Sequence, residues 1–236
     1  MNKLLLPILV LFYWSCSTEK SIPEVTPQNQ NVTRALNYAA LGDSYTIGES
    51  VCTTCCFPEQ LKAGLQALNT AVSLDIVAQT GWTTTNLKTA ISQQLPATNY
   101  DLVTLLIGVN NQYQNKPFAL YEQEFPELVT IAIAKARGLK QNVIVVSIPD
   151  YAFTPFGVGT GATNQATISA QLDNYNTFAQ NYCLQNNITF VTITDITRQG
   201  LITPSLVASD GLHPSQLAYS KFVERIVPLA KLKLGL

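Results

Sequence analysis

The chain has a single histidine, His213, which lies three residues after Asp210 and directly before Pro214. An aspartate at this spacing in a turn can accept a hydrogen bond from the imidazole Nδ1 and leave Nε2 free. That arrangement fixes the tautomer that a general base needs. Because there is no second imidazole, acid–base chemistry of this kind must use His213, and metal sites built from several histidines are excluded.

A candidate nucleophile, Ser44, follows a short apolar stretch in the segment Gly42-Asp43-Ser44. A serine between a strand and a helix exposes its backbone N–H near a helix N-terminus, where an oxyanion is stabilised. Two more donors follow apolar stretches, the backbone N–H of Gly81 and the side-chain amide of Asn110. Each segment alone also fits an ordinary turn or helix cap.

The elements that must position these residues alternate from about residue 34 onward. Alternating or continuous apolar residues predict strands at 37–41, 72–78, 102–107, 143–148 and 188–193. Helical periodicity predicts helices at 58–69, 83–95, 118–137, 164–186 and 215–232. This pattern predicts one α/β domain over residues 34–236 with a five-stranded parallel sheet, whose ligands bind at the carboxyl ends of the strands.

In this order and spacing, the segments resemble the SGNH, or GDSL-type, hydrolase family over nearly the whole of residues 36–229. The matching residues are Gly42-Asp43-Ser44 with Gly48, then Gly81, Gly108-Val109-Asn110, and Asp210 with His213. The resemblance implies a flavodoxin-like, three-layer α/β/α sandwich. One departure is that the third block usually continues with Asp, where this chain has Asn111. That change concerns the geometry of the loop rather than the oxyanion donor.

The resemblance also implies a serine esterase without metal or organic cofactor. Ser44 would be the nucleophile, His213 the general base, and Asp210 the group that orients the imidazole. The oxyanion hole would consist of the N–H groups of Ser44 and Gly81 and the side chain of Asn110.

The substrate is less defined than the chemistry. The segment 150–163 is rich in Gly, Thr and aromatic residues. With nearby aromatics it could form an apolar or sugar-stacking wall from Trp82, Tyr113, Tyr151, Phe153 and Phe156. The same segment could equally be a surface loop with its aromatics in the core. We expect a small-molecule or glycan ester as substrate, and a small-acyl or lipid ester would need the same catalytic residues. The alternative is a glycan-binding surface lipoprotein that has lost catalysis on the same scaffold.

The N-terminus has the pattern of an export signal. Lys3 precedes an apolar run over residues 4–14, which is too short to span a membrane but suits a signal-peptide core. The run ends at Ser15-Cys16, which resembles a bacterial lipobox with Cys16 as the lipidated residue. We therefore expect a signal peptide over 1–15 and a flexible tether over 16–33. The protein would be a lipoprotein in the periplasm or at the cell surface of a bacterium, bound to membrane only through its lipid anchor.

Four other cysteines, Cys52, Cys55, Cys56 and Cys183, would then meet an oxidising compartment. We expect a local disulfide among the first three, with Cys183 as a buried thiol. A metal site with Cys183 as the fourth ligand lacks the second C-x-x-C of usual zinc sites. A metal-dependent deacetylase is excluded because it needs more than one histidine.

Charge excludes one further class of partner. The chain has 14 basic and 15 acidic residues, and charged residues make up only 12% of it, against about 25% in an average domain. Neutral polar groups replace the missing charge, with 25 Thr, 17 Asn and 17 Gln. Nucleic acid is therefore not an expected partner, because phosphate binding needs clustered positive charge. We expect a monomer.

Overall fold

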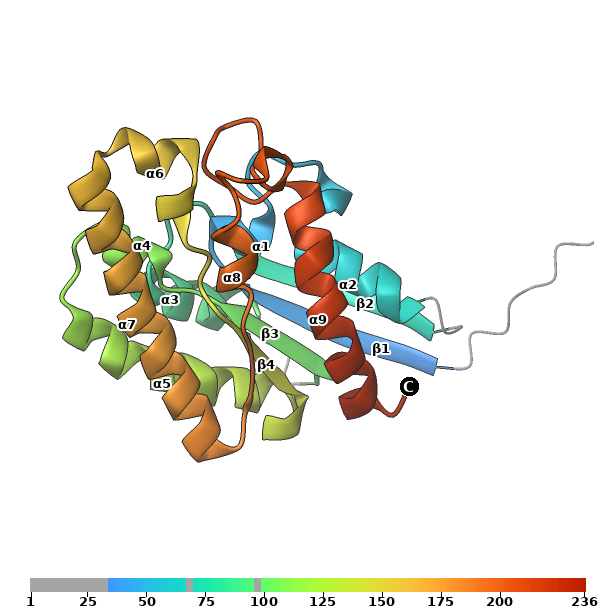
Figure 1. The fold of residues 1–236 in the computed structure, drawn as a ribbon. Helices are drawn as coiled ribbons and strands as arrows, with labels where there is room; N and C mark the ends of the chain where they lie inside the picture. Colours follow the sequence, from blue (N-terminus) through green and yellow to red (C-terminus); the bar gives the residue numbers. More distant parts are fainter. Residues whose placement is uncertain (1–33, 67–69, 96–98) are drawn as a thin grey trace, which may run out of the picture. The chain divides into compact units, whose positions relative to one another are not determined.

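A computed structural model of the protein describes residues 34–66, 70–95 and 99–236, so the predicted signal peptide, Cys16 and tether lie outside the described residues. Its sheet has the order β2-β1-β3-β4-β5, and every neighbouring pair is parallel (Figure 1). The strands are β1 (Arg34–Gly42), β2 (Thr70–Ala78), β3 (Leu102–Leu106), β4 (Val143–Val146) and β5 (Thr189–Val191). This strand order is flavodoxin-like, as predicted.

Helices cover both faces of the sheet. α2 (Phe57–Gln66) and α9 (Gln216–Leu234) pack together on one face, and α3 (Thr84–Gln94), α5 (Phe118–Lys135) and α7 (Ala162–Asn186) pack on the other (Figure 1). The shorter helices are α1 (Ser44–Ile47), α4 (Val109–Tyr113), α6 (Pro155–Gly159) and α8 (Thr194–Thr197). The three-layer α/β/α prediction is confirmed. None of the helices described has the length and apolar character needed to cross a bilayer.

Burial explains why the central strands were recognisable in the sequence. Every residue of β3 and β4 is buried, because helices cover both faces of these strands. The predicted threonine cap of α3 is also present, since Thr83 accepts from the Asn86 N–H while the Asn86 side chain accepts from the Thr83 N–H. The predicted helix 118–137 ends earlier, at Lys135, because Arg137 and Gly138 have positive φ angles of 59° and 76°.

The end of β1 packs too closely for any side chain. A Cβ placed on Gly42 would lie 2.0 Å from the Thr46 Oγ1 and 2.4 Å from the Leu106 carbonyl oxygen. Only glycine lets β1 end beside β3 and turn at once into α1, and this turn sets the position of Ser44.

We predict that Gly42→Ala lowers the free energy of unfolding by about 2–3 kcal/mol, because the backbone of β3 cannot move away from the added methyl group. Urea unfolding followed by circular dichroism measures this. Gly159→Ala is the matched control, because nothing lies within 4 Å of a Cβ there. Equal stability of the two variants would contradict the close approach.

Candidate active site

One cavity at the carboxyl edge of the sheet brings together residues from four separate segments. Ser44 follows β1, Gly81 follows β2, Asn110 lies in α4 after β3, and His213 precedes α9. All four line a cavity of about 210 Å³. Parallel strands carry their following loops to the same edge of the sheet, which explains why distant motifs meet here.

Ser44 is the first residue of α1 and is 4% exposed. The preceding residue, Asp43, caps the helix, and its Oδ1 accepts the Tyr45 N–H at 3.0 Å. Within the described chain, the N–H of Ser44 has no acceptor, as expected for the first turn of a helix. The serine hydroxyl and this free N–H therefore belong to one rigid turn.

The Asp43 carboxyl is fully buried directly beneath this turn. Its Oδ2 has no hydrogen-bond partner among the described residues. Burial raises the pKa of Asp43 from 3.8 to about 7 and outweighs the hydrogen bond from the Tyr45 N–H, which lowers it. An ionised carboxylate at this position costs free energy in the folded protein.

The His213 imidazole is held by Asp210. Its Nδ1 lies 2.5 Å from the Asp210 Oδ2, while the Asp210 Oδ1 accepts the backbone N–H groups of Leu212 at 2.9 Å and His213 at 3.0 Å. Burial raises the pKa of Asp210, but these hydrogen bonds outweigh it and hold that pKa well below its usual value. Asp210 is therefore an anion beside the imidazole, and Nε2 is left for the cavity.

Two residues that the sequence analysis missed also fix this pair. The Ser50 hydroxyl donates to the Asp210 Oδ2 at 2.7 Å. The Tyr45 ring meets the His213 ring edge-on, with their centroids 5.6 Å apart. Tyr45 could have been suspected from its place beside Ser44, but no pattern links Ser50 to a residue 160 positions later.

Two further N–H donors face the cavity. Gly81 has a φ of +84°, and no described atom lies within 4 Å of where its Cβ would be, so its backbone is open. Asn110 uses one amide hydrogen on the Trp82 carbonyl oxygen at 3.0 Å. The second hydrogen has no acceptor among the described residues, so a substrate oxygen can approach it.

Asn111, the departure from the family pattern, is buried and orders the loop. Its Oδ1 accepts the Thr84 N–H at 2.9 Å, and its Nδ2 donates to the Thr84 Oγ1 at 2.7 Å. The Thr84 hydroxyl donates in turn to the buried carboxylate of Glu124 at 2.5 Å. An aspartate at position 111 would place a carboxylate directly beside Thr84. In this chain the carboxylate that contacts Thr84 is that of Glu124, on α5.

The aromatic residues predicted for the pocket divide into two groups. Tyr113, Tyr151 and Phe156 line the cavity, with ring centroids 6.1–6.2 Å apart. Trp82 and Phe153 do not line it. The Trp82 carbonyl, rather than its ring, serves the site by holding Asn110. Phe153 packs under the Arg198 guanidinium, 5.8 Å from it, because Arg198 is drawn to the buried Asp150.

The cysteine loop lies next to the site in sequence. Cys52 and Cys55 form a disulfide, whereas Cys56 and Cys183 are buried thiols. Burial raises the pKa of Cys183 to about 12, so it is an inert thiol. No group of three or more His, Cys, Asp or Glu side chains in the described part of the chain could hold a metal ion.

A hydroxyl, an imidazole paired with a carboxylate, and free N–H donors around one cavity are the groups that acyl transfer requires. Fold and site together define the class of carboxylic ester hydrolases. More narrowly, the chain belongs to the GDSL-like Lipase/Acylhydrolase family, whose model matches residues 40–221. No curated relative matches the chain in sequence.

Solved structures share the fold at low sequence identity. A lipolytic protein of the G-D-S-L family from Veillonella parvula is 14% identical, with a TM-score of 0.63 over 81% of this chain and 96% of that one. A lipase/acylhydrolase from Enterococcus faecalis is 19% identical, with a TM-score of 0.61 over 84% and 95%. An acetylxylan esterase from Geobacillus stearothermophilus is 17% identical, with a TM-score of 0.59 over 85% and 94%.

The buried Asp43 predicts a pH dependence of stability. Between pH 3.8 and about 7 the folded protein retains a proton that the unfolded chain has released. The free energy of unfolding therefore falls as the pH rises through this window. Asp43→Asn keeps an acceptor for the Tyr45 N–H but cannot ionise. Between pH 4 and 8 its free energy of unfolding should therefore fall by less than that of the wild type, and the difference between the two falls should reach up to roughly 4 kcal/mol at pH 8. Urea unfolding of both proteins from pH 4 to 8 measures the difference, and parallel curves would contradict a protonated Asp43.

Proposed function

We propose that the protein is an exported serine esterase that removes short acyl groups, acetyl above all, from glycans. The observation that carries the proposal is the single cavity lined by Ser44, Gly81, Asn110 and His213, with His213 held by Asp210. These groups come from four segments, and each has an unused atom available to the cavity.

The proposed reaction gives each group a distinct role. The His213 Nε2 takes the proton of the Ser44 hydroxyl as the oxygen attacks the ester carbonyl, and the Asp210 anion stabilises the imidazolium. The resulting oxyanion accepts hydrogen bonds from the N–H groups of Ser44 and Gly81 and from the Asn110 amide. The imidazolium then protonates the leaving alcohol, and water attacks the acyl-enzyme by the same path.

The size of the cavity supports a short acyl group. At about 210 Å³ it is smaller than the roughly 300–1,000 Å³ typical of pockets for drug-sized ligands. Tyr151 is buried, with its hydroxyl donating to the Gln112 Oε1 at 2.9 Å, so it cannot swing aside easily. Phe156 and Tyr113 are partly exposed at 37% and 54% and form the outer wall.

A glycan alcohol is supported by a more general argument. Exposed aromatic rings beside a catalytic cavity can stack on sugar faces, and Tyr113 and Phe156 have this position. The acetylxylan esterase among the similar structures acts on such a substrate. Export fits a polymer that lies outside the cell, and the Cys52–Cys55 disulfide fits an oxidising compartment. Lipid attachment at Cys16 is part of the same proposal.

We predict that Ser44→Ala and His213→Ala abolish hydrolysis of p-nitrophenyl acetate, since neither group has a substitute. Asn110→Ala should lower kcat by about 10²–10³ through the loss of one oxyanion donor. Steady-state kinetics measures these effects, with thermal unfolding as the check on folding. Full activity of Ser44→Ala would refute the assignment, and a wild-type protein that cleaves no ester would favour a non-catalytic glycan-binding role.

The acyl preference provides a second prediction. In a series of p-nitrophenyl esters, kcat/KM should be highest for acetate and fall as the acyl chain lengthens, because Tyr151 and Phe156 close the cavity. Phe156→Ala should shift the preference towards longer chains. Phe153→Ala removes an equal ring from the same loop but outside the cavity, and it should keep the wild-type order. A wild-type preference for long chains would overturn the acetyl assignment.

A further inference from the structure

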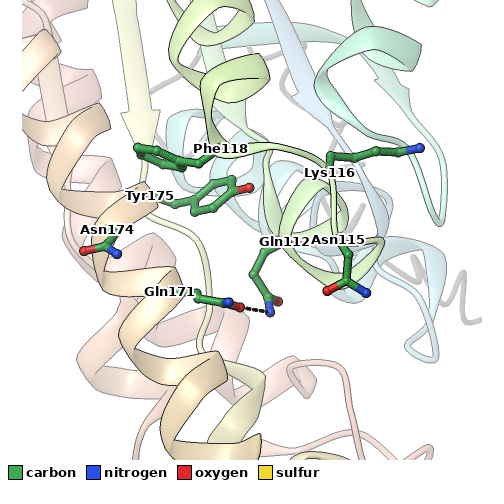
Figure 2. Close-up of a pocket in the computed structure, with 7 residues that line it drawn as sticks. All are labelled: Gln112, Asn115, Lys116, Phe118, Gln171, Asn174 and Tyr175. Atoms are coloured by element: carbon green, nitrogen blue, oxygen red, sulfur yellow. Dashed lines mark hydrogen bonds between the residues drawn. The ribbon is translucent and has the colours of Figure 1, made fainter.

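A second hollow lies beside α4, and it shares no lining residue with the catalytic cavity (Figure 2). Residues of α4, of the α4–α5 connection, of the start of α5 and of α7 line it, and its volume is about 260 Å³. We call this hollow the α4–α7 groove. The mechanism uses none of the groups that line it.

One side chain joins the groove to the cavity. Gln112 is 8% exposed and lies in α4 between Asn110 and Tyr113, which line the catalytic cavity. Its Oε1 accepts from the Tyr151 hydroxyl at 2.9 Å, and its Nε2 donates to the Gln171 Oε1 at 2.8 Å (Figure 2). The two hollows are therefore adjacent, because Gln112 of the groove is hydrogen-bonded to Tyr151 of the cavity.

The groove contains a polar group that no protein group uses. Tyr175 is 4% exposed, and the part that stays accessible includes its hydroxyl, which has no hydrogen-bond partner among the described residues. Its ring packs edge-on against Phe118 at 4.9 Å, and Figure 2 shows the hydroxyl directed from α7 towards α4. Burial raises the pKa of Tyr175, which keeps the phenol a neutral donor. An accessible phenol hydroxyl without a protein partner is available to donate to or accept from a ligand in the groove.

Other groups around the groove also have unused hydrogen-bonding capacity. Among the described residues, the side-chain amides of Asn115 and Asn174 have no partner, and Gln171 uses only its oxygen. The one charged side chain that lines the groove, Lys116, extends away from Gln171 in Figure 2. Carboxamides and a phenol both donate and accept hydrogen bonds. This chemistry suits vicinal hydroxyl groups better than an anion or an apolar chain.

We infer that the α4–α7 groove is a binding subsite for a neutral sugar residue of the polymer whose acyl group lies in the catalytic cavity. The inference rests on the proposed glycan substrate and names where the chain of that glycan lies. The sugar hydroxyls would bond to the Tyr175 hydroxyl and the Gln171 amide, and the Phe118 and Tyr175 rings would supply apolar contact. The Gln112–Tyr151 hydrogen bond would form the boundary between sugar and acyl sites.

Calorimetric titration of the full chain with xylohexaose, mannohexaose and cellohexaose tests the subsite without any catalytic step. We expect at least one of these neutral oligosaccharides to bind. Tyr175→Phe removes only the unpartnered hydroxyl and should weaken binding about 5-fold, as should Gln171→Ala. Tyr182→Phe and Gln185→Ala, which make the same changes further along α7, should bind like the wild type.

Absence of binding to all three oligosaccharides, or equal binding by all variants, would overturn the subsite. Binding that weakens steeply with added salt would also overturn it, because the ligand site would then depend on Lys116 and an anion. Hydrolysis of p-nitrophenyl acetate separates this inference from the proposed function. An active esterase without sugar binding refutes only the subsite, whereas sugar binding without ester hydrolysis refutes only the proposed reaction.

Discussion

The hydrogen bond between Asp210 and His213 is the interaction on which the rest of the site depends, because the chain has no other imidazole. The carboxylate is shared among four donors, two of them backbone N–H groups of its own turn. That turn is held as well, since the Ala208 N–H donates to the His213 carbonyl oxygen at 2.7 Å. The imidazole thus has one orientation before any substrate arrives, which is the pre-organisation that acid–base chemistry requires.

Neutral amides and hydroxyls form many of the buried hydrogen bonds that link the helices around the site. Asn111 links α4 to α3 through Thr84, and only at Glu124, which also lies near the ammonium group of Lys88, does the network reach a charge. Gln112 similarly connects Tyr151 to α7. The low proportion of charged residues is therefore reflected in the interior: buried polar networks made of amides avoid the desolvation cost that buried ions would bring.

Sequence reasoning was most successful where one physical cause dominates. β3 and β4 were predictable because burial on both faces demands continuous apolar residues. The residues around the cavity were predictable because few residue types can supply a nucleophile, a base or an N–H donor. It was wrong for the rings of Trp82 and Phe153, which do not line the cavity; the Phe153 ring instead packs under Arg198, a residue distant in sequence. The α4–α7 groove could not be predicted from the sequence, because its residues come from α4, the α4–α5 connection, the start of α5 and α7. Export and lipidation at Cys16 stay predictions.

The four segments around the cavity span most of the chain, since Ser44 and His213 are 169 positions apart (213 − 44). Neither the strands alone nor the first two-thirds of the chain can assemble the site. A chain truncated before Asp210 would keep Ser44, Gly81 and Asn110 but would lose the one imidazole that lines the cavity.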